Sequence, residues 1–494
     1  MLYYPMELLE DIGEQVRIRM EKLEQLQKEG RDPFLQTLFT QTNNSGQILN
    51  GFDKLDGKTV SIAGRIVLQR VMGKASFCHI LDEHGKIQFY ISTNDVGEQA
   101  YEDFKKYDLG DIVGVTGKVF KTKTGEISIH ATTIVLLAKA LHPLPDKHAG
   151  LKDAELRYRE RHVDLIVNEE VREIFKKRSK VIKAVRDFLD NNGFLEVETP
   201  VLQNLAGGAN ARPFVTHHNA LDMKMYLRIA VELHHKRLII GGFEKIYEVG
   251  RVFRNEGISY KHNPEFTMLE YYCAYTDYHG ISDYFEKMIK HVIKTVAGKD
   301  KISYQGVELD FSKPIRRVKM IDIVKEVTGL DFAKLDAGAA EAELKKLKLD
   351  LPKLKTWGTL LYAAFDQCVE KTLVQPTFVM EYPVEVAIFC KQCKHDSRLA
   401  ELAELFICGK EMGNSYTEIN NPIDQRSRFA AQVEARAGGD DEAHEMDEDF
   451  LKAMSYGMPP TGGQGCGIDR LVMLLTDTHS IRESLLFPTM RNKV

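Results

Sequence analysis

The stretch FRNEGISYKHNPEFTMLEYYCAY, residues 253–275, places charged and aromatic side chains in an order that suits nucleotide chemistry. Arg254 and Glu256 lead into a turn at Gly257, and Phe266 follows that turn. A guanidinium group binds phosphate through paired hydrogen bonds, and an aromatic ring stacks on a base. Each of these residues alone is more often an ordinary surface residue. The combination indicates a nucleotide site.

The same stretch predicts two antiparallel strands, 243–254 and 264–275, around the loop 255–263. Side chains of equal parity lie on one face of a strand. The second strand therefore presents three such residues on one face, namely Phe266, Glu270 and Tyr272. A later strand through NSYTE presents three more, namely Asn414, Tyr416 and Glu418. A polar face that crosses several strands is either solvent-exposed or the floor of a site, and the nearby nucleotide pattern favours a site.

Two further patterns contain cysteine or glycine. In GGQGCGIDR the glycines at 463, 465 and 467 permit close backbone approach, and Arg470 would begin the helix that follows them. The pair CKQC, residues 390–393, with His395 nearby is a possible zinc site. One cysteine pair supplies only half of a tetrahedral shell, however, and no second CxxC or HxxxH lies nearby. Two free thiols in a loop are the preferred interpretation.

The elements that must position these residues differ between the two ends of the chain. Apolar residues recur at steps of three and four within 6–30, which predicts an amphipathic helix. From residue 58 the period becomes two, and five short strands predict a small closed barrel of the OB-fold type. Beyond residue 170 helices alternate with strands, which predicts a largely antiparallel sheet. The expected fold class is α+β.

Boundaries follow from Pro, Gly and changes in periodicity. We expect four parts and one insertion: a helix and lead-in over 1–57, the barrel over 58–146, a linker over 147–170, the larger domain over 171–494, and a polar helical insertion near 310–370.

Composition excludes several classes of protein. A chain of 494 residues exceeds the size of a single core. No apolar run approaches the roughly 20 residues of a membrane span, and the N-terminus lacks the pattern of a signal peptide. Seven scattered cysteines indicate reduced thiols, so we expect a cytoplasmic protein without membrane attachment. With a net charge of −5, a nucleic acid would need a local basic surface.

Three segments together resemble the three motifs of class II aminoacyl-tRNA synthetases. These are FLEVETPVL (194–202), GRVFRNEG with HNPEFTMLEYY (250–272), and GGQGCGIDRLVML (462–474). Over nearly its whole length the chain is similar to the bacterial-type lysyl-tRNA synthetases, and the class I signatures HIGH and KMSKS are absent. The resemblance implies an OB-fold anticodon-binding domain, a class II catalytic domain over 171–494, and a lysine–tRNA ligase.

The resemblance also implies roles for single residues. Arg254 and Arg470 would be catalytic, and the ATP contacts would be Arg254, Glu256, His262, Phe266, Glu404, Glu411 and Arg470. Glu404 and Glu411 resemble the ligands of Mg²⁺. The pocket for L-lysine would consist of Glu232, Glu270, Tyr272, Asn414, Tyr416 and Glu418. Phe77, Gln88 and Glu126 would contact the anticodon of tRNA(Lys), and Pro200 would lie at the interface of a homodimer.

The acids agree with a lysine substrate on physical grounds. An ammonium group taken out of water needs carboxylates around it. An aspartate substrate would need a basic residue instead, and these acids would repel it. The departures from the family pattern surround the pocket, at Val231, at His234–His235 and within 385–396. They leave pocket size and discrimination among lysine analogues open.

Two other functions remain alternatives. An inactive relative that only binds tRNA would be expected to have lost some of Arg254, Glu404, Glu411 or Arg470, and all four are present. A ligase that attaches lysine or an analogue to a protein would lack the anticodon barrel, which this chain contains. For Phe77 alone, packing in the barrel core remains an alternative to base stacking.

Overall fold

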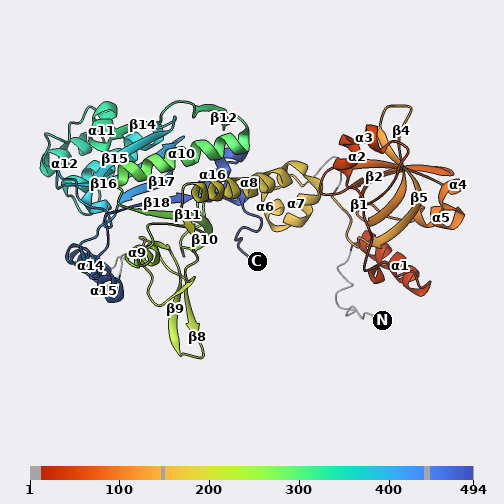
Figure 1. The fold of residues 1–494 in the computed structure, drawn as a ribbon, viewed down its shortest axis with the longest axis horizontal. Coiled ribbons are helices and arrows are strands. Elements are labelled where there is room, and N and C mark those ends of the chain that lie inside the picture. The colour runs from red at the N-terminus through yellow and green to blue at the C-terminus, as the bar shows by residue number, and fades with distance from the viewer. Residues whose placement is uncertain (1–12, 146–150, 439–444, 493–494) are drawn as a thin grey trace. The chain divides into compact units, whose positions relative to one another are not determined.

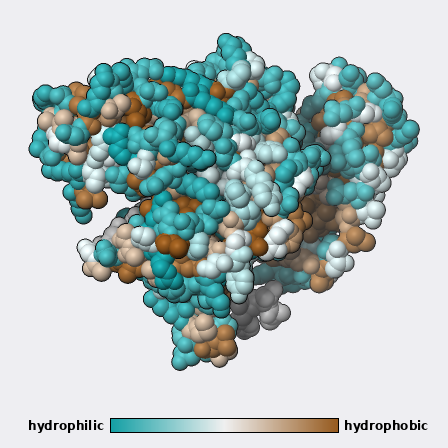
Figure 2. Space-filling model, turned by 60° about the vertical axis from the view of Figure 1, so that its left-hand side comes forward, coloured by the Kyte–Doolittle hydropathy of each residue, from teal (hydrophilic) through white to brown (hydrophobic). Residues whose placement is uncertain are grey.

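The computed structural model describes residues 13–145, 151–438 and 445–492. The chain forms two compact units, divided between Lys152 and Asp153. This division falls inside the segment 147–170 that the sequence indicates as a linker. In the described part of the chain, no helix is long and apolar enough to cross a membrane. The face drawn in Figure 2 is mostly hydrophilic, with its apolar residues in separate patches.

The first unit contains a closed five-stranded barrel, which confirms the predicted OB-fold. Its strands are β1 (Thr59–Met72), β2 (Ala75–Leu81), β3 (Lys86–Ser92), β4 (Ile112–Lys121) and β5 (Ile127–Ala138). They close in the order β1-β2-β3-β5-β4, with β3 and β5 parallel. On β2 the side chains alternate, so Cys78 and Ile80 fill the barrel whereas Phe77 and His79 lie outside it.

Short helices surround the barrel (Figure 1). They are α1 (Glu14–Lys28), α2 (Ser45–Asn50), α3 (Phe52–Leu55), α4 (Thr93–Val96) and α5 (Glu98–Lys105). Helix α1 is attached by Arg19, whose guanidinium donates to the backbone oxygens of Ala140 at 3.0 Å and His142 at 3.2 Å. Lys139 is buried beside it and pairs with Asp111 at 2.8 Å. These contacts fix α1 against the end of β5.

The second unit is built on an eight-stranded, mostly antiparallel sheet, as the sequence predicts. Its order is β14-β15-β16-β17-β18-β11-β10-β6. The strands are β14 (Arg316–Lys319), β15 (Thr377–Pro383), β16 (Leu399–Ile407), β17 (Lys410–Thr417), β18 (Thr461–Gly467), β11 (Glu265–Ala274), β10 (Lys245–Phe253) and β6 (Leu195–Glu196). The predicted hairpin is therefore present as β10 and β11, between β18 and the edge strand β6.

One face of this sheet packs on three helices, α8 (Glu169–Asn191), α10 (Tyr278–Ala297) and α16 (Ile468–Thr476) (Figure 1). A large apolar core lies between them and includes Phe285, Leu269 and Leu471, which are fully buried. Because one face of the sheet is committed to this core, the polar residues of opposite parity on β11, β17 and β18 face the other side. That side holds the candidate site.

Within 310–370 the chain forms β14 and three helices, α11 (Met320–Thr328), α12 (Ala337–Lys346) and α13 (Trp357–Ala364). A π-helical turn (Phe365–Val369) follows α13. These helices bury Leu360 and Phe365 against β15 and β16 in a second apolar core. The segment therefore supports the edge of the sheet that carries Glu404.

The remaining elements frame the open side of the sheet. They are the small sheet of β7 (Leu202–Gln203), β9 (Met223–Leu227) and β8 (Val215–His218), together with α9 (Glu232–Ile240), α14 (Pro422–Ala437) and α15 (Glu448–Met454). The peripheral elements are α6 (Ala154–Arg159), α7 (Arg161–Val167), α17 (Ile481–Ser484), β12 (Lys301–Tyr304) and β13 (Val307–Asp310). Helix α9 packs on β11 and α15, so it forms one wall of the site.

Candidate active site

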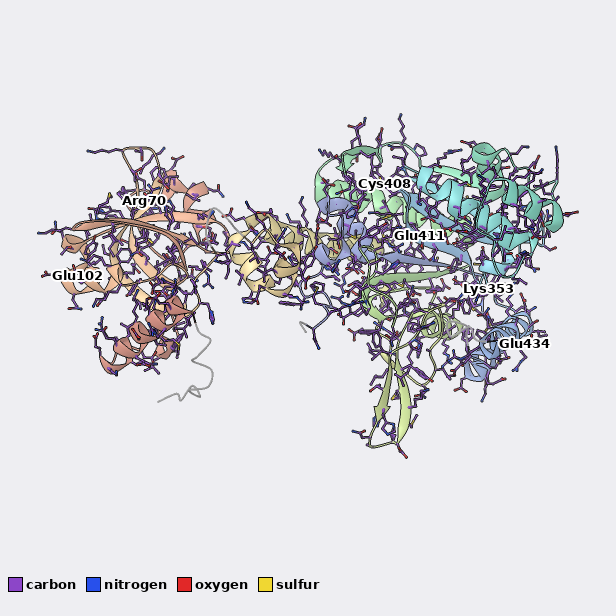
Figure 3. All side chains as sticks on the ribbon, turned by 180° about the vertical axis from the view of Figure 1, so that it is seen from behind. Arg70, Glu102, Lys353, Cys408, Glu411 and Glu434 are labelled. Atoms are coloured by element: carbon purple, nitrogen blue, oxygen red, sulfur yellow. The ribbon has the colours of Figure 1, made fainter. Side chains whose placement is uncertain are left out.

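A cavity of about 510 Å³ opens over the central strands of the large sheet. The lining includes twelve of the residues named from the sequence: Glu232, Arg254, Glu256, His262, Phe266, Glu270, Tyr272, Glu404, Glu411, Asn414, Tyr416 and Arg470. Figure 3 marks Glu411 on the strands that carry this cavity. Glu418 lies just behind the cavity and is fully buried. The structure thus brings together residues that are up to 238 positions apart in the chain, from Glu232 to Arg470.

The hairpin explains why the charges of residues 253–275 meet the aromatic residues. Strands β10 and β11 pair in antiparallel register, with Val252 opposite Phe266 and Glu248 opposite Glu270. Arg254 follows β10 directly, and its guanidinium carbon lies 5.2 Å from the centre of the Phe266 ring. The loop between the strands supplies Glu256 and His262 to the same cavity. The charged groups therefore line a floor that adjoins an aromatic ring.

Glycines on β18 make room for the polar side chains of neighbouring strands. A Cβ atom at position 463 would lie 1.9 Å from Oε1 of Glu418 and 2.7 Å from the Tyr272 ring. A Cβ atom at position 465 would lie 2.7 Å from Oδ1 of Asn414. The sequence pattern indicates a close approach to the glycine backbone, and side chains of the site make this approach. Glycine is required at position 463 because the facing carboxylate of Glu418 is fully buried and cannot move away.

The two arginines lie at the polar end of the cavity. Burial lowers the pKa of Arg254, and the nearby Glu256 partly offsets this. Nη1 of Arg470 donates to the backbone oxygen of Glu411 at 2.6 Å and lies 3.4 Å from its Oε2 atom. Two guanidinium groups on one cavity wall favour a ligand with several negative oxygens.

Glu404 and Glu411 come from the adjacent strands β16 and β17 and face the same part of the cavity. Burial raises the pKa of Glu404 to about 8, and the negative charge of Glu411 raises it further. A hard cation between two such carboxylates would remove this repulsion, and oxygen donors are those that Mg²⁺ prefers. The donor set thus fits a magnesium ion that also binds phosphate oxygens.

At the other end of the cavity two of the expected pocket acids are already paired. Nζ of Lys236 lies 2.6 Å from Oε1 of Glu232 and 2.6 Å from Oε2 of Glu418. Lys236 is completely buried, and its ammonium lies 5.0 Å from the centre of the Phe389 ring. The sequence reasoning missed this lysine. The Glu-x-x-x-Lys spacing on α9 was a usable signal, since residues i and i+4 of a helix are neighbours.

Glu270 is the pocket acid without such a partner. Its Oε2 accepts a hydrogen bond from the Tyr272 hydroxyl at 3.0 Å, and its Oε1 accepts one from the Val231 backbone at 3.4 Å. Burial raises the pKa of Glu270 to about 8, and the charge of Glu232 adds to the effect. Among the described residues, no lysine or arginine forms an ion pair with Glu270. A cationic ligand would find its counter-charge here.

One departure from the family pattern near α9, His235, joins a buried network next to Tyr272 of the pocket. Nε2 of His235 lies 3.2 Å from Oε2 of Glu248, whose other oxygen accepts from Arg228 at 2.5 Å. The His235 ring packs edge-on against Tyr272, with 5.4 Å between the ring centres. Burial lowers the pKa of His235. A substituted residue therefore positions a pocket tyrosine from behind without lining the cavity.

In the barrel, the three residues named from the sequence lie together on the outer face. The Phe77 ring is half-buried outside the core, 5.2 Å from the centre of the Tyr90 ring. Nε2 of Gln88 donates to Oε2 of Glu126 at 2.9 Å. Nε2 of His79 lies 2.8 Å from Oε1 of the same glutamate. His79 and Tyr90 are additions to the group, and strand alternation was the signal for both, relative to Phe77 on β2 and to Gln88 on β3.

Pro200 lies on an exposed segment at one margin of the second unit. Four apolar residues near it are also exposed: Leu195, Val201, Leu202 and Leu205. A group of exposed aliphatic side chains around one proline is typical of a surface that another protein covers.

Residues 153–491 match the family model described as tRNA synthetases class II (D, K and N), and residues 60–137 match that of the OB-fold nucleic acid binding domain. A protein of Thermoanaerobacter sp. (strain X514) named lysine–tRNA ligase is 54% identical over 486 residues, which is 98% of this chain and 97% of that protein. One of the same name from Carboxydothermus hydrogenoformans is 54% identical over 483 residues, covering 98% and 99%. The one from Clostridium acetobutylicum is 53% identical over 477 residues, covering 96% and 93%.

Proposed function

Since the chain belongs to the class II tRNA synthetases of the aspartate, lysine and asparagine group, we propose that its cavity activates L-lysine with ATP and transfers it to the 3′ end of tRNA(Lys). The observation that carries this proposal is the cavity itself. Arginines and a carboxylate pair stand at one end of it, and a buried, unpaired Glu270 stands at the other. The full-length similarity to lysine–tRNA ligases supports the same activity.

The reaction has two steps. The lysine carboxylate attacks the α-phosphorus of ATP, a bond to the bridging oxygen breaks, and lysyl-adenylate and pyrophosphate form. The terminal ribose hydroxyl of tRNA then attacks the lysyl carbonyl and releases AMP. In the first step no side chain needs to act as a base, because the attacking carboxylate is already ionised. Positioning and charge neutralisation supply the rate.

Roles at the ATP end follow from the geometry of the cavity. Arg254 would bind the α-phosphate and the lysine carboxylate together, and Arg470 would cover the base opposite Phe266. Glu256 and His262 would contact the adenine and the terminal phosphates from the hairpin loop. When bound at Glu404 and Glu411, Mg²⁺ supplies positive charge to the phosphate oxygens.

Roles at the lysine end need one refinement of the simple three-acid pocket. Lys236 neutralises part of the charge of Glu232 and Glu418. Glu270 with Tyr272 would therefore hold the ammonium of the substrate side chain. Asn414 and Tyr416 line the same end of the cavity and would close the pocket around the methylene chain. This arrangement also explains how several buried acids coexist in the absence of lysine.

The outer face of the barrel would bind the anticodon. OB-folds bind unstacked bases on aromatic side chains and contact base edges with polar groups. Phe77 would stack on a loop base, and Gln88 and Glu126 would bind base edges. We further propose a cytoplasmic homodimer in which Pro200 and the exposed aliphatic residues around it lie at the interface.

Amino-acid-dependent exchange of labelled pyrophosphate into ATP, run separately with each of the twenty amino acids, tests the function. Lysine should support exchange strongly, and arginine only weakly. Exchange that aspartate or asparagine supports better than lysine would overturn the pocket assignment. Binding of tRNA with no exchange for any amino acid would favour the inactive relative. Exchange with lysine but transfer only to a protein would favour the protein ligase.

A further inference from the structure

Three potential metal ligands meet between β15 and β16, outside the cavity of the active site. They are Glu381 of β15, and Cys393 and His395 of the connection that leads to β16. Their ligand atoms all lie within 4.8 Å of one another. The cysteine pair 390–393 offers half a shell in the sequence. In the structure Glu381, and not Cys390, lies beside Cys393 and His395, so the third donor is a carboxylate. Glu381 is 12 positions from Cys393 in the chain.

A bulge aims the carboxylate of Glu381 at this cluster. The pairing of β15 with β16 shifts register between Met380 and Tyr382. Glu381, between them, adopts φ = +64°, a conformation that residues other than glycine rarely adopt. Bulges of this kind re-aim a side chain within a sheet. Oε2 of the nearly buried Glu381 then lies 3.1 Å from Nε2 of His395.

Cys393 is the second directed donor. Only 4% of the surface of this residue is exposed, and its thiol makes no hydrogen bond with any residue that the structure describes. A buried thiol beside a carboxylate and an imidazole therefore lacks a polar partner. A metal ion would supply that partner and displace the thiol proton to solvent.

We propose that Glu381, Cys393 and His395 bind one divalent transition-metal ion, with zinc as the best match. Zinc takes thiolate, imidazole and carboxylate ligands at about 2.0–2.3 Å in a tetrahedron, so donor atoms then lie roughly 3.3–3.8 Å apart. From a separation of up to 4.8 Å, the donors need to approach one another by about 1.5 Å at most. His395 is more than half exposed and can make this movement, and a water molecule completes the shell on its side.

The competing group at this place is Lys319. Its ammonium lies 3.0 Å from Oε1 of Glu381 and is half-exposed. An ammonium and a metal ion both need the negative charge of this carboxylate. Removal of the ammonium should therefore tighten metal binding. If Glu381, His395 and Lys319 form only a set of ion pairs, removal of the ammonium should weaken metal binding.

The location gives such a metal a consequence for the pocket. The same connection contributes residues 386–390 to the wall of the main cavity. It also pairs with the pocket strand through the bridge between Cys390 and Glu418. A metal at Cys393 would fix the end of this wall and so favour lysine binding. This second effect depends on the proposed function, whereas binding of the metal does not.

The test uses the full chain, stripped with a chelator, dialysed and titrated with Co²⁺ as a spectroscopic substitute for zinc. A thiolate-to-cobalt charge-transfer band should saturate at one equivalent, and mass-spectrometric metal analysis after zinc loading should find one ion per chain. Cys393→Ser should abolish the band, and His395→Ala should weaken affinity at least about 10-fold. Lys319→Met should increase the affinity for Co²⁺. Cys390→Ser and Cys368→Ser serve as matched thiol controls and should keep the band.

Retention of the band in Cys393→Ser, or no metal above background in the reloaded protein, would overturn the proposal. Because His395 is exposed, His395→Ala tests the site even if Cys393→Ser fails to fold. Tighter Co²⁺ binding by Lys319→Met would support a true metal site over a set of ion pairs, and weaker binding would contradict it. The effect on the pocket is read as a lower KM for lysine in the zinc-loaded protein, at constant excess Mg²⁺. An unchanged KM would remove that effect and leave the metal stoichiometry intact.

Discussion

Nζ of Lys236 lies 2.6 Å from Oε2 of Glu418, and both side chains are fully enclosed. A buried ion pair is strongly destabilised when one partner is removed, because the other charge remains without compensation. This pair therefore supports the floor of the pocket, although Glu418 itself does not line the cavity. Lys236 is a positioning residue whose contribution can be measured.

Lys236→Met should lower the free energy of unfolding by about 3–5 kcal/mol at pH values where both acids are ionised. The methionine keeps the length of the side chain and removes the charge. Urea denaturation measures the effect, and Lys345→Met is the matched control. Lys345 pairs with Glu341 at the same i, i+4 spacing on the surface, where the loss should stay below about 0.5 kcal/mol. Equal losses for the two variants would contradict the role of Lys236.

Arg254→Ala should reduce adenylate formation by at least about 100-fold, as expected for the loss of one positioned charge donor. Pyrophosphate exchange measures the effect, and circular dichroism checks the fold. Arg251→Ala is the control. Arg251 lies on β10, three residues before Arg254, but is exposed and pairs with Glu265 at 3.5 Å. Near-normal exchange in Arg254→Ala would show that this arginine has no role in adenylate formation.

The raised pKa of Glu270 predicts how the stability of the folded protein changes with pH. This pKa is about 8 in the empty folded protein, against 4.5 as the ordinary value, so the folded state binds the extra proton. Stability must then fall as pH rises from about 5 to about 8, by up to roughly 1.4 kcal/mol per pH unit for one proton. Glu270→Gln should flatten part of this slope in urea denaturation at several pH values.

The raised pKa values of Glu232, Glu404 and Glu418 contribute to the slope that remains. Exposed Glu434 on α14, marked in Figure 3, provides the control variant Glu434→Gln, which should leave the slope unchanged. A slope that is identical in Glu270→Gln and in the unmodified protein would refute the assignment of the proton to Glu270.

Phe77→Ala should weaken aminoacylation of tRNA(Lys) roughly 5- to 150-fold at constant salt, because one stacking contact is worth about 1–3 kcal/mol. Pyrophosphate exchange needs no tRNA and should hardly change. Phe89→Ala is the comparison, since Phe89 is fully buried in the barrel core. That variant should lose about 3–5 kcal/mol of stability. If Phe77→Ala were as destabilised as Phe89→Ala, Phe77 would be a packing residue.

Sedimentation should show a homodimer, with an interface above about 2,000 Å² as in obligate dimers. The double variant Val201→Glu/Leu202→Glu should dissociate it, because two carboxylates would be buried without partners. Val327→Glu replaces an equally exposed valine on α11 and should leave the dimer intact. A stable, active monomer of the unmodified protein at micromolar concentration would exclude the proposed interface.

Strand parity made much of the site predictable from sequence. Phe266, Glu270 and Tyr272 line the cavity because β11 alternates as its sequence indicates. The pairing of Lys236 with Glu418 could not be foreseen, since it joins α9 to the end of β17 across 182 positions. The partnership of Glu381 with Cys393 also escaped prediction. It depends on a register shift in the sheet, and neither residue type nor spacing reports such a shift.

The lack of side chains at the glycines of β18 limits which amino-acid substitutions this protein could tolerate. Alanine at position 463 would add only a methyl group, yet that methyl would lie 1.9 Å from an oxygen of Glu418. Glu418 cannot retreat, because Lys236 holds it and nothing around it is open to solvent. In a saturation-mutagenesis survey, inactivating changes should therefore be as frequent at Gly463 as at Arg254, although this glycine offers no side chain to any substrate.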